Sequence, residues 1–249
     1  MGSVGVTGLT RPTIEHRHAS STRWFYVFMA LLIAVTVIYG FSQTVEHTLI
    51  HPAFPRPALL YAHGLLFFSW VVLFLIQACL VQTRKMRRHR QLGLTGLVVG
   101  AIIPPVGIAT SLLMARFDID HRIFSRASAE AFLAIPLNDM ISFGSCVALA
   151  ALWRRKRDLH RRLMLMATCC LTAAAFARFP FITIDAVRWY GGVDLLILLG
   201  VGFDLATTRQ IHPAYAYGLP LLVLGQTIAM TLYLLSPPAW LGIAGWMIG

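Results

Sequence analysis

Three histidines occupy similar places in basic stretches of the chain. Segments 84–92 and 155–163 both read R-K-x-x-x-H-R-x-L, which gives His89 and His160 the same position in the two copies. His212 lies in a shorter and weaker relative of this pattern. Each histidine is followed by an apolar run, and the shared spacing suggests that the three residues have a common role.

Neutral imidazole binds transition metals and haem iron. We expect the three histidines to begin three helices on one side of a membrane, where the partial positive charge of helix N-termini disfavours protonation. Asp204, eight residues before His212, is expected to orient one ring or to pair with Arg209. His89, His160, His212 and Asp204 therefore form a predicted metal site, and the three histidines form a predicted site for haem b.

The basic residues around the histidines also have an ordinary explanation. Lys and Arg between membrane spans set the orientation of a protein in the bilayer and contact anionic lipid headgroups. This explanation accounts for the arginines and lysines, but it does not require a histidine at one fixed offset. Both interpretations stay open.

A further histidine is expected nearer the opposite side of the membrane. His63 precedes Trp70 and Gln77 at intervals of seven residues, so the three side chains share one face of a helix. His63 is interpreted as an axial haem ligand or a proton-relay group, with a structural hydrogen bond to a neighbouring helix as the alternative. Arg178 is a candidate to hold an anionic group such as a haem propionate.

A polar stripe made by Asn138, Asp139 and Ser142 interrupts another apolar run. Charge inside a membrane is costly and is retained where it is paired or used. The simplest interpretation is an ion pair between Asp139 and Arg178. The alternative is that the stripe lines a pathway for a proton or a small molecule.

The composition indicates what kind of protein positions these residues. Hydrophobic residues make up 57% of the chain and charged residues only 12%, whereas soluble domains contain about 25% charged residues. Several apolar runs reach the ~20 residues that span a bilayer as a helix. The sequence therefore predicts an all-α, polytopic transmembrane helix bundle. Its seven helices are expected at 24–41, 58–81, 92–113, 130–153, 159–179, 193–206 and 213–235.

The predicted domain organisation has three parts. Residues 1–22 are polar and are expected to form a disordered cytoplasmic tail. Residues 23–238 form the seven-helix transmembrane domain, and the apolar tail 239–249 is expected to lie in the membrane interface.

The distribution of basic residues predicts the orientation. Segments 84–90 and 154–162 hold 11 of the 21 Lys and Arg residues. The positive-inside rule then places these loops, the N-terminus and the three histidines in the cytoplasm. We expect a multi-pass protein of a bacterial inner membrane, with the lipid bilayer and anionic headgroups as partners. Membrane orientation also explains the net charge of +11 without nucleic acid binding.

Several classes of protein are disfavoured by missing motifs. The sequence contains no H-E-x-x-H, Walker or G-x-G-x-x-G pattern, so zinc proteolysis and nucleotide binding are not expected. Both lysines, Lys85 and Lys156, lie in loops, so a retinal Schiff base is not expected either. The four cysteines lie in apolar segments and predict no disulfide framework.

Short motifs carry a resemblance to known proteins. They are H-R-x-L-G at 89–93, L-H-R-R-L-M at 159–164 and H-P-x-Y at 212–215. With them the helical region resembles uncharacterised bacterial multi-spanning proteins that are described as predicted integral membrane proteins. The chain is more loosely similar to cytochrome b561-type proteins. That resemblance implies haem b held between helix histidines, although here the histidines lie at helix ends.

Three functions are therefore expected as alternatives. The first is a membrane protein that binds haem b or a metal near the cytoplasmic face and transfers electrons. The second is a proton-coupled small-molecule transporter that uses Asn138, Asp139 and Arg178. The third is a non-catalytic membrane assembly protein. Whether the chain is an enzyme, and whether it associates with itself or with a redox partner, is left open.

Overall fold

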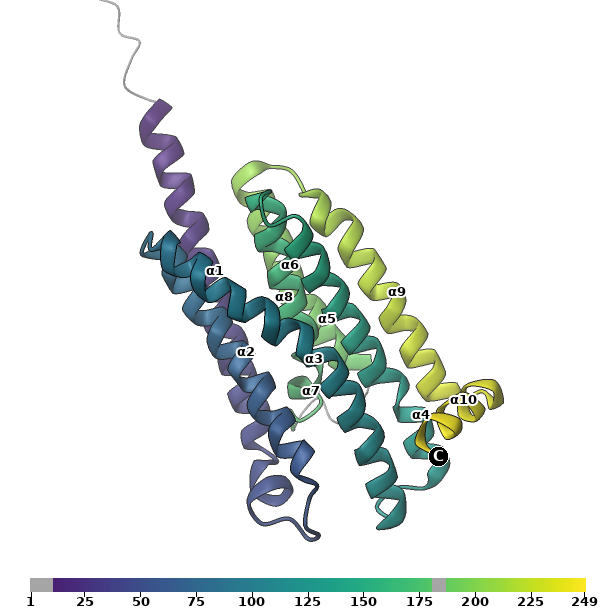
Figure 1. Ribbon diagram of the computed structural model, residues 1–249. Coiled ribbons are helices and arrows are strands. Elements are labelled where there is room, and N and C mark those ends of the chain that lie inside the picture. The colour runs from purple at the N-terminus through teal and green to yellow at the C-terminus, as the bar shows by residue number, and fades with distance from the viewer. Residues whose placement is uncertain (1–10, 181–186) are drawn as a thin grey trace, which may run out of the picture.

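The regular structure of this protein is helical throughout the part of the chain that its computed structural model describes, residues 11–180 and 187–249. Six of the helices are long and apolar enough to cross a bilayer. These findings confirm the predicted all-α polytopic membrane bundle, which Figure 1 shows as a set of elongated helices running side by side.

The helices follow one another with short connections. Their bounds are α1 (Arg11–Ser42), the π-helix η1 (Glu46–Ile50), α2 (Ala58–Gln82), α3 (Met86–Asp120), α4 (Arg126–Phe132), α5 (Ala134–Leu152), α6 (Arg157–Cys170), α7 (Ala173–Phe176), α8 (Val187–Thr208), α9 (Pro213–Leu235) and α10 (Pro238–Ile248). Helix α1 begins well before the predicted start at residue 24, and the predicted tail lies partly outside the described residues. The predicted interfacial tail contains α10, which contacts α3 and α4.

Two of the seven predicted spans are broken helices. The fourth consists of α4 and α5, which are separated at Leu133. Pro136 explains this break, because it lacks the N–H that would bond the carbonyl of Phe132 one turn earlier. The fifth consists of α6 and α7, separated at Leu171 and Thr172. There the Thr172 amide and hydroxyl both donate to the Cys169 carbonyl, over 2.9 and 2.6 Å, so the amide bonds three residues back and not four.

The connections between helices gather at two ends of the bundle. The connections 83–85, 153–156 and 209–212 lie at the same end, which we call the basic end. The connections from α1 to α2 and from α3 to α4 lie at the opposite end with the C-terminus (Figure 1). This arrangement agrees with the prediction that the three basic loops share one side of the membrane.

Small residues bring the helices close together. On α3, Gly100 faces the Trp70 ring of α2, and a Cβ at this glycine would lie 3.0 Å from that ring. Gly96, one turn earlier, faces Leu73. The two glycines form a G-x-x-x-G spacing, whose lack of side chains lets α2 and α3 approach closely.

The centre of the bundle is apolar and tightly packed. Phe143, Leu165, Ile197 and Tyr215 are almost completely buried there, from four different helices. On α8, Ile197 lies between Asp194 and Asp204, so apolar packing separates the polar groups of the two halves of this helix.

Candidate functional site

The two histidines of the repeated motif begin α3 and α6 at the basic end. The rings of His89 and His160 are close enough to influence each other electrostatically. The Nδ1–H of His160 donates to the Ala150 carbonyl over 2.9 Å, which leaves Nε2 to face other groups. The Nδ1 atom of His89 is buried without a hydrogen-bond partner. The two histidines that share a position in the repeated motif therefore also lie in the same region of the basic end.

His212 has a different environment. It is the N-cap residue of α9, and its Nδ1 accepts a hydrogen bond from the Ala214 amide over 3.1 Å. An imidazole that accepts through Nδ1 is neutral. Burial, and to a smaller extent the Arg162 guanidinium, lower the pKa of His212 below its ordinary value. His212 therefore acts as a helix cap at this position.

Asp204 is bound by an arginine that the sequence did not single out. The Arg162 guanidinium donates from Nε to Asp204 Oδ2 over 2.8 Å and from Nη2 to Oδ1 over 2.6 Å. Both side chains are buried, with 4% and 3% of their residue surfaces exposed. This bidentate pair joins α6 to α8. The predicted pairing of Asp204 with Arg209 is therefore wrong, because the buried guanidinium that reaches this carboxylate is that of Arg162.

The predicted metal site is not assembled by these contacts. In the described ranges 11–180 and 187–249, no group of three or more His, Cys, Asp or Glu residues is placed to hold a metal ion. The Asp204 carboxylate is occupied by Arg162, and His212 turns its Nδ1 toward its own helix. Within the predicted set, His89 lies near His160, and His212 lies near Asp204.

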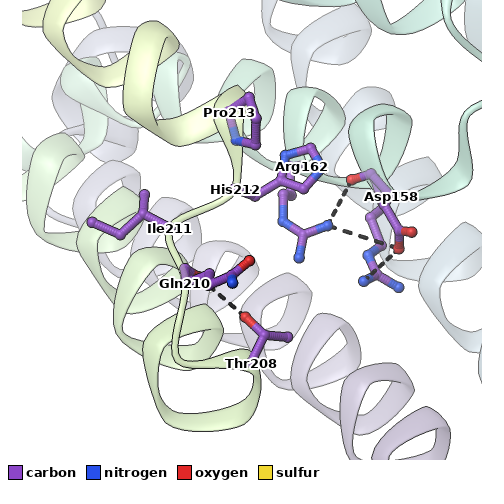
Figure 2. A pocket seen from close by; sticks show the side chains of 8 residues that line it. Asp158, Arg162, Thr208, Gln210, Ile211, His212 and Pro213 are labelled. Carbon is purple, nitrogen blue, oxygen red and sulfur yellow. Dashed lines mark hydrogen bonds and ion pairs between the residues drawn. The ribbon is translucent and has the colours of Figure 1, made fainter.

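An open pocket of about 250 Å³ lies at the basic end between α6 and the connection from α8 to α9. Figure 2 shows Asp158 and Arg162 on one side of it and Thr208, Gln210 and Ile211 on the other. Asp158 forms an ion pair with Arg161 at 2.7 Å. Because the acids and arginines around the pocket pair with each other, the charges of its wall are largely compensated.

A hydrogen-bonded cluster lies in the half of the bundle away from the basic end. The Tyr190 hydroxyl donates to Asp139 Oδ1 over 2.9 Å. The Tyr190 hydroxyl oxygen also accepts a hydrogen bond from the Asn138 side-chain amide over 3.0 Å. These two bonds join α5 to α8. Tyr190 was missed from the sequence because the residues before it do not form a long apolar run, so the predicted sixth helix began only at residue 193.

A second polar pair adjoins this cluster. Gln226 of α9 donates through Nε2 to Asp194 Oδ1 of α8 over 3.0 Å. Gln226 is buried and Asp194 is half-buried. Gly225, next to Gln226, faces the Asn138 side chain, and a Cβ at this glycine would lie 2.6 Å from Asn138 Oδ1. Helices α5, α8 and α9 are therefore connected by polar groups within the apolar bundle.

A groove of about 500 Å³ runs between α8 and α9 beside these groups. Tyr190, Asp194 and Gln226 provide its polar wall, while Met230, Leu234 and Leu235 contribute apolar surface. Two threonines on α9, Thr227 and Thr231, also line it. Tyr190 lines the groove and also donates to Asp139, so the Asp139 cluster lies directly behind the groove wall.

Arg178 and Asp139 do not form the predicted ion pair. Both residues are in the described part of the chain, and each has other partners. The Arg178 guanidinium donates to the Thr44 hydroxyl over 3.0 Å and lies over the Phe41 ring at 4.4 Å. These contacts hold the end of α7 against the end of α1 and leave Asp139 to Tyr190.

His63 and Ser142 do not take part in the hydrogen bonds of this cluster among the described residues. His63 stacks on Phe67 with a ring separation of 4.0 Å, and its Nδ1 is buried without a hydrogen-bond partner. Ser142 is partly buried on α5, one turn beyond Asn138. Two residues of the predicted polar stripe, Asn138 and Asp139, are therefore connected by hydrogen bonds to Tyr190.

Comparison with known proteins adds no relative. No protein-family model, curated protein or solved structure matches the chain. The resemblances to uncharacterised bacterial membrane proteins and to cytochrome b561-type proteins stay predictions.

Proposed function

We propose that this protein is a proton-coupled transporter of a small molecule, and that Asp139 is the proton-binding group. The observation that carries the proposal is the bond from Tyr190 to Asp139 at the wall of the groove between α8 and α9. The basic end faces the cytoplasm in this proposal, and the membrane is the bacterial inner membrane.

The chemistry of Asp139 supports reversible protonation. A carboxylate inside a bundle is costly when no cation neutralises it. The partner of Asp139 in the structure is a neutral hydroxyl, since Arg178 binds elsewhere. A proton or a ligand cation nearby removes much of this cost. Proton loss and substrate binding are thereby linked at one place, which is the requirement for coupled transport.

The packing supports access from one side at a time. The groove adjoins Asp139 in the half away from the basic end. Toward the basic end, Leu165, Ile197 and Tyr215 are almost fully buried, and the Arg162–Asp204 pair lies beyond them. In this conformation the cluster is separated from the basic end, and transport requires α8 and α9 to move relative to α6.

A substrate-independent experiment tests the proposal. Dicyclohexylcarbodiimide reacts with protonated carboxyl groups in apolar surroundings, and peptide mapping by mass spectrometry locates the product. We expect labelling of Asp139 that increases as the pH falls and is absent in Asp139→Asn. Ser142→Ala is the matched control on the same helix and is expected to label like the unchanged chain. A folded protein that shows no labelling of Asp139 at any pH between 5 and 8 contradicts the proposal.

Proton movement gives the second arm of this test. Vesicles containing the purified protein and an internal pH-sensitive dye are given a pH gradient, and candidate substrates are added outside. The proposal expects a substrate-dependent proton flux that Asp139→Asn lowers about tenfold or more. Flux that is unchanged by this substitution overturns it.

A cofactor site at the basic end is the second candidate. The Nδ1–H of His160 is held by a carbonyl, as is usual for histidines that bind a metal through Nε2. His89 lies close enough to influence it electrostatically, so these two imidazoles would be the residues to hold haem b or a metal ion. Such a group would supply electron transfer.

An absorption spectrum and metal analysis of the purified protein test this candidate. It expects a Soret band or a stoichiometric metal that is lost in both His89→Ala and His160→Ala. His212→Ala is the control and is expected to retain the group. A spectrum without a Soret band, together with less than stoichiometric metal, eliminates the candidate.

A further inference from the structure

The groove between α8 and α9 combines an acid with an apolar wall. Asp194 contributes a half-buried carboxylate, and none of the described residues that line the groove is Lys, Arg or His. The volume of about 500 Å³ falls within the range of roughly 300–1,000 Å³ that is usual for small-molecule pockets. The groove therefore has the size and the charge for a small ligand that carries a positive group.

The carboxylate of Asp194 is only partly occupied by the protein. Gln226 donates to Oδ1 over 3.0 Å, which fixes the orientation of the side chain. Oδ2 makes no hydrogen bond to the described residues. A ligand cation would complete the coordination of this carboxylate and would neutralise a charge that is otherwise expensive in a membrane.

The rim of the groove determines how a ligand reaches it. Leu234 and Leu235 expose 59% and 73% of their surfaces at its end away from the basic end. In a membrane these side chains face lipid tails. A ligand that enters here must partition into the bilayer first, which requires an apolar body in addition to its charge.

The aromatic wall adds to the recognition of a cation. Tyr190 lines the groove, and the faces of aromatic rings attract cations, most strongly when the cation has lost its water shell. Tyr190 also holds Asp139, so a cation in the groove lies beside the proton-binding group.

We infer that the groove binds an amphipathic organic cation taken from the membrane, with Asp194 as its charge partner. This inference rests on the proposed function and names the substrate class for it. Binding of the cation and loss of a proton from Asp139 then offset each other, and the net movement of charge into the bundle stays small.

Equilibrium binding of radiolabelled tetraphenylphosphonium to the full-length protein in detergent tests the inference. Triphenylphosphine oxide, a neutral molecule with a similar body, is the competitor. We expect saturable binding that the neutral competitor does not displace and that Asp194→Asn weakens about tenfold or more. Asp194→Glu restores the carboxylate and is expected to recover most of the affinity.

A matched control separates the groove from general charge effects. Asp120 is an exposed acid outside the groove, at the end of α3. Asp120→Asn is expected to bind the cation like the unchanged chain. Equal loss in Asp120→Asn and Asp194→Asn, or equal affinity for the cation and its neutral analogue, overturns the inference. The inference is also overturned if a second copy of the chain covers the groove. Cross-linking between cysteines that replace Leu234 and Leu235 would reveal such a dimer.

The failure of this inference can be distinguished from that of the proposed function. Carbodiimide labelling of Asp139 reports on the proton-binding group without any substrate. Labelling of Asp139 combined with cation binding that ignores Asp194 rejects the substrate class alone. Specific cation binding at Asp194 without labelling of Asp139 rejects proton coupling and shows that the groove is a binding site.

Discussion

The Tyr190 hydroxyl lies 2.9 Å from Asp139 Oδ1 and so connects the start of α8 to the middle of the α4–α5 span. Tyr190 is itself buried, and its oxygen also accepts a hydrogen bond from Asn138. The phenol therefore connects the groove to the acid behind it.

Tyr190→Phe removes the hydroxyl and retains the ring. Asp139 then loses its donor and Asn138 loses its acceptor inside the bundle, which is expected to cost about 1–3 kcal/mol of stability. We expect a lower melting temperature and a substrate-dependent proton flux reduced several-fold. Tyr233→Phe, at a ring of α9 outside this cluster, is the control and is expected to change neither measurement.

The buried ion pair between α6 and α8 predicts strongly non-additive mutations. Arg162→Met or Asp204→Leu leaves one buried charge without its partner and is expected to destabilise the protein by about 3–5 kcal/mol. The double variant removes both charges and is expected to recover most of that loss. Thermal unfolding in one detergent compares the unchanged chain, the two single variants and the double variant. Additive losses of stability in the double variant would show that the interaction between Arg162 and Asp204 contributes little to stability.

The cap at the start of α9 predicts a pH dependence. The neutral ring of His212 accepts the Ala214 amide, and its pKa is lowered in the folded chain. The unfolded chain therefore binds a proton before the folded chain as the pH falls through about 6.5. Stability contributed by this residue is complete above that pH and is lost below it, up to the ~1 kcal/mol of a helix cap.

His212→Asn provides the matched comparison for the cap. Asparagine caps helices but does not titrate, so the decline of the melting temperature between pH 7 and pH 5 should become smaller. His212→Ala should instead lower stability throughout this range. A decline that is as steep in His212→Asn as in the unchanged chain would assign the pH dependence to other groups.

Gly225 predicts a sensitive contact between α9 and α5. Gly225→Ala places a methyl group against the Asn138 side chain, which the bond to Tyr190 holds in position. We expect a loss of about 1–3 kcal/mol from overpacking and a weaker cation affinity in the groove. Gly202→Ala on α8 is the control, because a Cβ there meets no atom within 4 Å.

The sequence predicted six of its seven spans well, because each of these is a long apolar run, whereas the predicted fifth span, 159–179, is not among the helices long and apolar enough to cross a bilayer. It predicted the polar stripe on α5 for the same reason, since Asn138 and Asp139 interrupt such a run. The partners could not be derived from these patterns. Tyr190 resembles any interfacial tyrosine and Gln226 is a single amide in an apolar helix. Their roles depend on contacts between α5, α8 and α9 that no local spacing encodes.

The histidine pattern also predicted only part of the contacts at the basic end. His89 and His160 share a motif and also a region of the structure, so their spacing was informative. His212 shares the motif only in part, and its ring is used by its own helix. The choice between two roles for Asp204 depended on Arg162, which lies 42 residues earlier in the chain.

The order of the ion pair along the chain has a consequence for biogenesis. Arg162 is synthesised before Asp204, and α6 with its early break is not by itself among the helices long and apolar enough to span the membrane. During translation Arg162 has no charge partner in the membrane until α8, which carries Asp204, has been synthesised. A nascent chain that stops before α8 should therefore leave α6 outside the bilayer, and insertion of the second half of the bundle should proceed as one concerted step.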